Sequence, residues 1–268
     1  MKIALTIAGS DSGGGAGIQA DLKTFHQFGV HGTSAIVALT AQNTRGVRAV
    51  HPAPVEFVRQ QLDALAEDLP PDALKTGMLA EPALVRLVAE VVRARRWTPL
   101  VVDPVMVATS GDRLLSADAE NLVRDELLPL AAVVTPNLDE AAILAGMPVE
   151  SVEEMERAGR MLVERGAGAA LVKGGHLEGD MVTDLLVTSS GVRRFEGPRI
   201  RSTSTHGTGC TLSAAITAGL ALGRPLEAAV EDAIDFVQRA IASAPGLGAG
   251  HGPLGHLVPP PAREPATP

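Results

Sequence analysis

The chain has little aromatic content and almost no cysteine. Its 268 residues include one cysteine, one tryptophan and no tyrosine, and aromatic side chains make up 2%. A single cysteine excludes an internal disulfide framework and any zinc site built from several thiolates. So few aromatic rings leave no stacking platform for single-stranded nucleic acid. The formal net charge of −8 repels phosphate backbones, so we expect no nucleic-acid partner.

Long apolar runs are also absent near the start of the chain. The run from Ile3 to Ala8 is interrupted by Thr6 and ends at Gly9. It is too short for a secretory signal or a membrane span. We therefore expect a soluble cytoplasmic protein that has no membrane partner and acts on a small molecule.

The pattern that is present alternates apolar runs with segments of helical spacing. Residues 100–103 and 131–135 are almost wholly apolar, as in parallel strands covered on both faces. This alternation predicts an α/β fold with a mostly parallel central sheet and helices on both faces. We expect strands at residues 2–8, 34–39, 73–76, 100–103, 131–135, 169–172, 181–187 and 192–195. We expect helices at residues 16–28, 56–69, 84–95, 117–128, 138–145, 152–165, 211–222 and 226–244.

No composition shift or linker divides the chain, so we expect one domain over residues 1–256. The last twelve residues, 257–268, contain five prolines and are expected to form an extended tail. Before them, residues 246–256 contain five glycines, which fits either a loop on the nucleotide side of a site or a mobile segment.

In open α/β sheets, ligands bind beyond the carboxyl ends of the strands, so the segments that follow strands are of interest. Residues 9–17 follow the first strand and contain five glycines, which let a backbone approach a ligand closely. Their spacing fits neither the dinucleotide fingerprint nor the Walker pattern. A flexible turn with Asp11 or Ser12 as a helix cap is the alternative.

Two polar segments follow later strands. Gln42 carries a planar amide with acceptor and donor groups, which suits the edge of a heteroaromatic ring, although a solvent-facing loop amide is the alternative. Glu140 has the chemistry to hold Mg²⁺, which takes one or two carboxylates and keeps several waters. The same spacing favours a helix cap formed by Asn137 and Glu140.

Lys173 ends a predicted strand and is followed by two glycines, so it can reach a phosphate or extend to solvent. Residues 205–211 open a predicted helix, where consecutive N–H groups and glycines form an anion site. Such a site stabilises charge that develops on oxygen during group transfer. Cys210 falls in the first turn, where we expect the helix dipole to lower its thiol pKa. An ordinary glycine-rich helix start with a small buried cysteine is the alternative.

Taken together, these segments resemble the hydroxymethylpyrimidine/phosphomethylpyrimidine kinases, which belong to the ribokinase-like superfamily. The resemblance runs in order from residue 4 to about residue 256. No single motif is specific, but the combination is. The segments that carry the resemblance are residues 7–11, 13–23, 38–44, 75–79, 103–106, 135–138, 173–176 and 206–215.

The resemblance implies ATP-dependent phosphorylation of 4-amino-5-hydroxymethyl-2-methylpyrimidine, first to its monophosphate and then to the diphosphate, in thiamine biosynthesis. It implies that Gln42 hydrogen-bonds the pyrimidine and that Asp21 holds its polar substituents. Gly9 and Met78 are expected to line the same pocket. A homodimer is also implied.

On the donor side, the resemblance implies ATP as phosphate donor and Mg²⁺ as cofactor. Sugar kinases of the superfamily carry an aspartate base where this chain has Cys210, so a general-base role of Cys210 is a hypothesis. The implied residues are Gly207, Thr208 and Gly209 for the anion hole, Lys173, Thr205 and Thr208 for the nucleotide, and Asn137, Glu140 and Asp103 for Mg²⁺.

Three other functions compete with this interpretation. A pyridoxal or pyridoxine kinase of the same superfamily also phosphorylates a hydroxymethyl group on a nitrogen heterocycle. A nucleotide-binding sensor without catalysis would use the glycine loops alone, but Lys173, Glu140 and Cys210 argue against it. A dinucleotide oxidoreductase is disfavoured by the failed glycine spacing.

Overall fold

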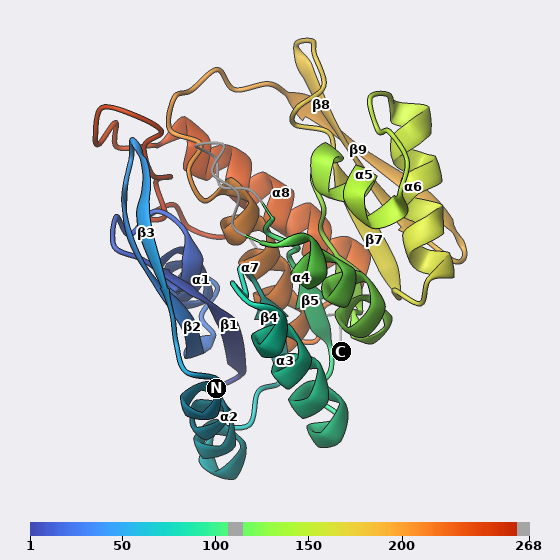
Figure 1. The fold of residues 1–268 in the computed structure, drawn as a ribbon. Helices are drawn as coiled ribbons and strands as arrows, with labels where there is room; N and C mark the ends of the chain where they lie inside the picture. The colour runs from blue at the N-terminus through green and yellow to red at the C-terminus, as the bar shows by residue number, and fades with distance from the viewer. Residues whose placement is uncertain (107–114, 262–268) are drawn as a thin grey trace, which may run out of the picture.

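The computed structural model describes residues 1–106 and 115–261. Within them, a nine-stranded sheet in the order β3-β2-β1-β4-β5-β6-β7-β8-β9 forms the centre of the molecule (Figure 1). Strands β2, β1, β4, β5, β6 and β7 run parallel, whereas β3, β8 and β9 pair antiparallel at the two sides. The predicted mostly parallel sheet is confirmed. The strands are β1 (Ile3–Asp11), β2 (His31–Asn43), β3 (Gly46–Pro52), β4 (Ala73–Thr76), β5 (Leu100–Val102), β6 (Val133–Val134), β7 (Ala169–Lys173), β8 (Met181–Thr188) and β9 (Gly191–Pro198).

Helices connect the strands and follow the predicted order. The segment predicted as one helix at 117–128 is divided into a short α-helix, a π-helical turn at Val123–Leu127 and a 3₁₀ turn at Leu128–Leu130. The α-helices are α1 (Gly17–Gln27), α2 (Val55–Asp68), α3 (Pro82–Arg95), α4 (Ala117–Leu122), α5 (Leu138–Ala145), α6 (Val152–Glu164), α7 (Thr208–Ala221) and α8 (Leu226–Ala242). In the described part of the chain, none of them is long and apolar enough to cross a membrane.

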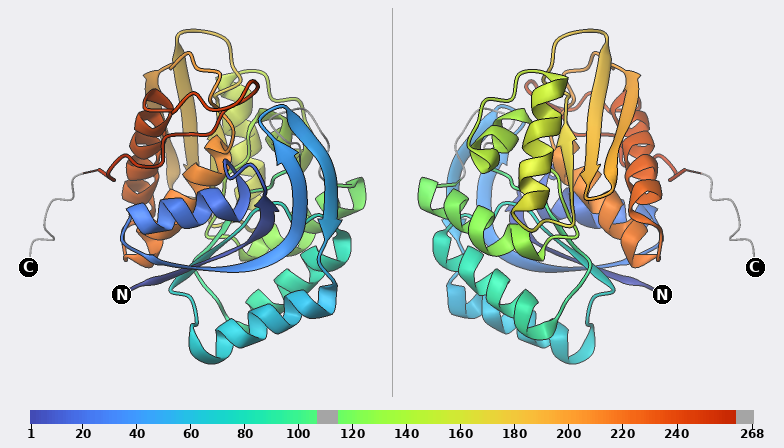
Figure 2. Two further views of the ribbon diagram at one scale, coloured as in Figure 1. Left: turned by 90° about the vertical axis from the view of Figure 1, so that its left-hand side faces the viewer. Right: turned by 90° about the vertical axis from the view of Figure 1, so that its right-hand side faces the viewer.

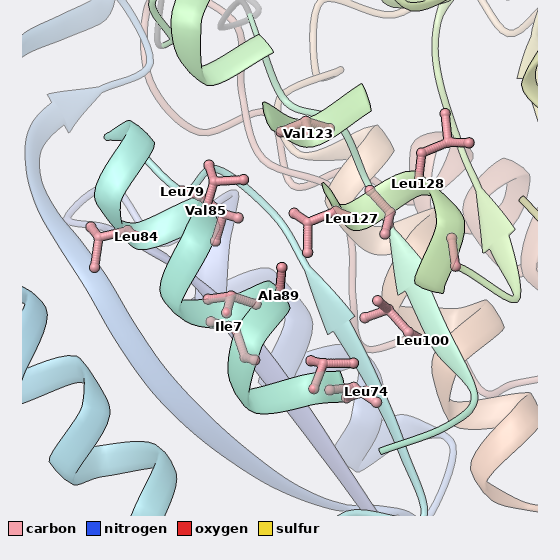
Figure 3. Packing of buried hydrophobic residues seen from close by; sticks show 14 of the residues in the cluster. Ile7, Leu74, Leu79, Leu84, Val85, Ala89, Leu100, Val123, Leu127 and Leu128 are labelled. Atoms are coloured by element: carbon pink, nitrogen blue, oxygen red, sulfur yellow. The ribbon is translucent and has the colours of Figure 1, made fainter. Parts of the chain in front are cut away.

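The sheet separates two hydrophobic layers, because successive side chains of a strand point to opposite faces. Leu5 and Ile7 of β1 pack with α2 and α3, whereas Ala4 packs with α1, α7 and α8 on the other face. Figure 2 shows these two groups of helices on opposite sides of the sheet. In the close view of Figure 3, Val85 and Ala89 of α3 lie over the strands. Each fully buried leucine contributes about 1.5–3 kcal/mol of transfer free energy.

The largest departure from the predicted elements is at β2 and β3. We expected a strand over 34–39 and a loop containing Gln42, but β2 continues to Asn43 and turns back as β3. The expected loop position of Gln42 is therefore wrong, since Gln42 pairs with Val47 inside this hairpin. The burial pattern explains the error: β3 is mostly exposed and lacks the apolar run by which buried strands are detected.

The end of the described chain has no helix or strand. In residues 257–261, the carbonyl of Pro259 accepts a hydrogen bond of 2.8 Å from the Arg239 side chain. Residues 262–268, the remainder of the predicted tail, lie outside the described residues.

The order of the strands determines where a ligand can bind. From β1, the chain passes through α1 on one face to β2, whereas from β4 it passes through α3 on the other face to β5. The connections thus diverge between the neighbouring strands β1 and β4. Open α/β sheets bind ligands in the crevice beyond the carboxyl ends of strands at such a switch point.

Candidate active site

The glycine loop at residues 9–17 leaves the carboxyl end of β1 and is organised by Asp11. The Asp11 carboxylate accepts backbone N–H groups of Gly13, Gly15 and Ala16 at 2.7–2.9 Å. It also meets Nε2 of His206 at 2.9 Å. Burial alone would raise the pKa of Asp11, but these hydrogen bonds hold it below its usual value. The loop is therefore organised around one buried carboxylate, which also accepts the N–H groups of Gly15 and Ala16 just before α1.

Gly9 and Met78 lie against one another, as expected for two residues that line one pocket. Met78 follows β4 and is 8% exposed. A Cβ atom on Gly9 would lie 2.6 Å from the terminal methyl carbon of Met78, so any side chain at position 9 would displace Met78. The structure thus brings these two predicted residues together at the switch point between β1 and β4.

The β2–β3 hairpin joins the glycine loop through Ser12. The Ser12 hydroxyl donates to the carbonyl of Gln42 at 2.7 Å and accepts the Gln42 N–H at 2.9 Å. The Gln42 residue is partly buried, with its backbone next to the loop. These bonds place Gln42 beside the glycine loop, although it belongs to a strand.

The first turn of α7 packs against the glycine loop. Gly207 caps the helix with φ of 84°, and a Cβ atom there would overlap the carbonyl oxygen of Gly15. Only glycine fits this close approach in a left-handed conformation. The helix begins at Thr208, three residues before the predicted start, so Thr208, Gly209 and Cys210 all lie in its first turn. The Thr208 hydroxyl donates to the carbonyl of Thr205 at 2.7 Å.

Lys173 and Asp103 lie next to this first turn. The Lys173 ammonium is 3.6 Å from a carboxylate oxygen of Asp103. Asp103 is buried and accepts hydroxyl hydrogen bonds from Ser213 at 3.1 Å and Thr135 at 3.2 Å. A Cβ atom on Gly209 would lie 3.2 Å from the ammonium nitrogen. The helix N-terminus, one cation and one carboxylate therefore meet at a single place.

Glu140 adds a second carboxylate to this group while capping α5. Its side chain accepts the backbone N–H of Asn137 at 2.9 Å, and the Asn137 side chain accepts the N–H of Glu140 at 2.9 Å. The predicted capping pair is confirmed. Burial raises the pKa of Glu140 to about 7; the Lys173 charge acts against this rise and the Asp103 charge adds to it. Asp103 and Glu140 are thus close enough to repel one another, as two carboxylates that bind one cation do.

Cys210 contradicts one expectation. The helix dipole was expected to lower the pKa of its thiol, but burial raises this pKa to about 12, and the nearby Lys75 charge reduces the rise only in part. Desolvation of the thiolate is the largest cause, and the charges of Asp21 and Asp103 add to the rise. The free thiol is therefore protonated near neutral pH.

Asp21 occupies a different place from the one expected of a substrate contact. Its side chain is fully buried, and its oxygens accept the Thr6 hydroxyl at 2.6 Å and the Lys75 ammonium at 2.9 Å. Burial alone would lower the pKa of Lys75, but the charges of Asp21, Cys210 and Asp103, together with the hydrogen bond to Asp21, outweigh burial and raise it. This buried pair lies beneath the site, with the Lys75 ammonium 3.6 Å from where a Cβ atom on Gly77 would be.

Several site residues escaped the prediction. Lys75 stands in a buried strand, which is an unusual position for a lysine and was the available signal. Asp11 was considered only as a helix cap. His206 and Ser213 lie in segments that the sequence analysis noted, but their contacts were not predicted, because their partners Asp11 and Asp103 are more than 100 positions away in the chain.

The glycine-rich segment 246–256 packs between the β2–β3 hairpin and the start of α7. The His251 N–H donates to the carbonyl of Thr44 at the tip of the β2–β3 hairpin at 2.7 Å, and the carbonyl of Gly252 accepts the His206 N–H at 3.1 Å. The His256 ring bonds to the Thr211 hydroxyl of α7 at 2.9 Å. The segment thus joins the hairpin tip to the start of α7.

Comparisons with known proteins give the family and the fold of this chain. The phosphomethylpyrimidine kinase family model matches residues 11–255. A hydroxymethylpyrimidine/phosphomethylpyrimidine kinase of Rhizobium meliloti is 52% identical over 258 residues, which are 95% of this chain and 97% of the relative. The ADP complex of Bacillus subtilis pyridoxal kinase has a TM-score of 0.90 at 37% identity and covers 96% of this chain and 97% of its own.

A solved phosphomethylpyrimidine kinase of Clostridium difficile has a TM-score of 0.81 at 41% identity, over 90% of this chain and 100% of that one. These solved structures confirm a ribokinase-like fold, and the shared family confirms a phosphotransferase. With its match over nearly the whole length, the chain belongs to the phosphomethylpyrimidine kinase family.

Proposed function

We propose that this protein transfers the γ-phosphoryl group of ATP to the hydroxymethyl oxygen of 4-amino-5-hydroxymethyl-2-methylpyrimidine and then phosphorylates the resulting monophosphate, in thiamine biosynthesis. One observation carries the proposal. The first turn of α7, with Lys173 and Asp103 beside it, packs directly on the glycine loop at Gly15 and Gly207. The proposed anion site at α7 and the proposed substrate site at the glycine loop therefore adjoin one another.

The acceptor pyrimidine is assigned to the crevice between the glycine loop and β4. Gln42 is proposed to hydrogen-bond the ring, with Gly9 and Met78 against it. Asp21 is fully buried and paired with Lys75. We propose that it holds the Lys75 side chain in place and does not contact the pyrimidine.

The donor phosphates are assigned to the first turn of α7. In the first reaction, the hydroxymethyl oxygen forms a bond to the γ-phosphorus, the bond from that phosphorus to the bridging oxygen breaks and releases ADP, and the hydroxyl proton passes to water or, in the general-base hypothesis, to Cys210. Residues 207–209 are proposed to bind the migrating group, and Lys173 the nucleotide phosphates, with Thr205 and Thr208 next to them. Such transfer depends mainly on positioning and on neutralising charge. In the second reaction, a phosphate oxygen of the monophosphate forms a bond to the γ-phosphorus of a second ATP, and ADP is released.

Mg²⁺ fits the carboxylates at this place. Within residues 1–106 and 115–261, no group of three or more His, Cys, Asp or Glu side chains is arranged to hold a metal. Mg²⁺ does not need one, since it takes one or two carboxylates and keeps several waters. Asp103 and Glu140 supply two, and a bound cation would offset the burial and the Asp103 charge that raise the pKa of Glu140. Asn137 is proposed to support them. When bound, Mg²⁺ neutralises charge on the phosphate oxygens.

Pyridoxal is a second candidate acceptor, because the ADP-bound structure with a TM-score of 0.90 is a pyridoxal kinase. Pyridoxal also presents a hydroxymethyl group on a nitrogen heterocycle. Gln42 beside the glycine loop favours the pyrimidine.

The assembly and location of the protein remain proposals. A homodimer in the cytoplasm is expected from the family resemblance. Analytical ultracentrifugation at micromolar concentration tests the oligomeric state. A species at the mass of one 27.6 kDa chain would contradict the dimer.

Product analysis tests the function directly. The protein is incubated with ATP, Mg²⁺ and the pyrimidine alcohol, and the products are separated over time. We expect the monophosphate first and the diphosphate later, with one ADP formed for each phosphate transferred. Parallel reactions with pyridoxal measure whether pyridoxal is phosphorylated as well. Absence of any phosphorylated pyrimidine would overturn the proposal.

A further inference from the structure

We infer that His206 is a positioning residue for phosphoryl transfer. Through Asp11, it holds the glycine loop at a fixed separation from the first turn of α7. The inference rests on the proposed function, in which the loop holds the acceptor and the turn holds the migrating group.

The contact itself joins residues 195 positions apart in the chain. Nε2 of His206 lies 2.9 Å from Oδ2 of Asp11, and the two side chains are 15% and 1% exposed. A histidine–carboxylate hydrogen bond so shielded from water is stronger than one at the surface. It connects the end of β1 to the segment directly before α7.

Asp11 transmits this connection to the whole glycine loop. Its carboxylate accepts three backbone N–H groups of the loop, those of Gly13, Gly15 and Ala16. Its own N–H donates to the Gln19 side chain in α1 at 2.8 Å. A shift of the Asp11 carboxylate would therefore move the loop as a unit.

His206 is also joined directly to the proposed anion hole, through the backbone. The next residue is Gly207, the N-cap of α7, which packs on the Gly15 carbonyl. A Cβ atom on Gly15 would lie 2.6 Å from Cδ2 of His206, so the ring packs on the loop backbone. The hydrogen bond and this packing fix the same two segments by independent contacts.

The other side of His206 is held as well. Its backbone N–H donates to Gly252 at 3.1 Å, and its backbone bridges to Pro253. The residue is thus fixed from the C-terminal segment and acts on the loop through its ring. Its ring contacts the glycine loop and its backbone contacts the C-terminal segment, so its proposed effect is on geometry. A misplacement of about 1 Å can cost about 100-fold in rate.

Two substitutions separate the hydrogen bond from the bulk of the ring. In His206→Gln, the side-chain amide nitrogen reaches about as far as Nε2, so the donor to Asp11 is kept. In His206→Asn, the amide ends near the position of Nδ1 and the donor is lost. His26→Asn, at an exposed position in the last turn of α1, is the control for an unspecific histidine replacement.

We expect His206→Gln to keep kcat within about threefold of the unmodified protein and His206→Asn to lower kcat by about 10- to 100-fold, with the KM for ATP changed less than about twofold. His206→Asn should also form more ADP per phosphorylated pyrimidine, because water competes for a misplaced phosphoryl group. His26→Asn should match the unmodified protein. Equal kcat losses in His206→Gln and His206→Asn would overturn the inference.

Amide hydrogen exchange gives a readout that needs no substrate. The N–H groups of Gly13, Gly15 and Ala16 should exchange faster in His206→Asn than in His206→Gln, since Asp11 is then free to move. If the unmodified protein phosphorylates no pyrimidine, the proposed function fails while exchange still tests the connection. Identical exchange in the two variants would overturn it.

Discussion

The Lys173 ammonium lies 3.6 Å from a carboxylate oxygen of Asp103, beside the backbone of Gly209 in the first turn of α7. This pair places one cation beside a buried carboxylate and a helix N-terminus. The cation is the part of the site that can follow a phosphate, because lysine is a flexible point charge.

Lys173→Met should lower kcat by about 100-fold or more, as loss of a charge that stabilises the transition state does. Lys2→Met, at an exposed surface pair, is the control and should leave kcat unchanged. Steady-state kinetics of both variants decides the matter. A loss of less than about threefold in Lys173→Met would remove this residue from the transfer step.

The same variant should also change how stability depends on pH. Glu140 has its pKa raised to about 7 even with the Lys173 charge present, so without that charge the pKa rises further. A raised carboxyl pKa means that the folded state holds the proton more tightly than the unfolded state, so stability falls as pH rises. Thermal unfolding should show a larger loss of Tm in Lys173→Met at pH 8 than at pH 6. An equal loss at both pH values would contradict this.

The Cys210 thiol should react slowly with iodoacetamide in the free protein. Alkylation requires the thiolate, and burial raises the pKa of Cys210 to about 12. We expect a rate near pH 7.5 that is about a hundredfold or more below that of free cysteine and still rises about tenfold per pH unit up to pH 9.5. Because the chain has one cysteine, the modified mass reports this site alone. A plateau below pH 8.5 would show a lowered pKa.

The general-base hypothesis requires that bound substrates lower the pKa of a thiol that is protonated in the free protein. If that happens, Cys210→Ala should affect the first phosphorylation more than the second. The alcohol of the first reaction must lose a proton, whereas the phosphate oxygen of the second needs no strong base. If Cys210 is the general base, single-turnover rates should fall by about 10- to 100-fold for the first step and less than about threefold for the second. Equal losses would argue against the assignment. A first-step change under about threefold would exclude Cys210 as the base.

His256 should make the protein less stable in acid. Its burial, together with the nearby Lys23 charge, lowers its pKa to about 4. The unfolded state therefore binds the proton first, and stability present above pH 6.5 is lost as pH falls towards 4, by at most about 1.4 kcal/mol per pH unit. Urea unfolding between pH 7 and pH 5 should show the stability advantage over His256→Gln shrinking. A constant difference would contradict the shifted pKa.

The sequence predicted the elements whose signal is local. β5 and β6 were found as apolar runs, and the β8–β9 hairpin from two runs separated by a short polar turn. β3 was missed because its side chains are mostly exposed, and its strand character comes from pairing with β2.

Within the site, the glycine-rich loops and Lys173 followed from their positions after strands. The Asp11–His206 and Asp103–Ser213 contacts could not be predicted, because each depends on the folding of segments more than 100 positions apart. The pKa of Cys210 was predicted in the wrong direction, since the sequence shows the helix start but not the desolvation around it.

A crystal structure with ADP, Mg²⁺, aluminium fluoride and the pyrimidine alcohol tests the central claim most directly. Aluminium fluoride takes the place of the phosphoryl group in transfer. We predict that it binds to the backbone of residues 207–209, with the hydroxymethyl oxygen facing it and the ring beside Gln42 and Met78. Aluminium fluoride bound away from α7, or a pyrimidine outside the crevice between β1 and β4, would contradict the account.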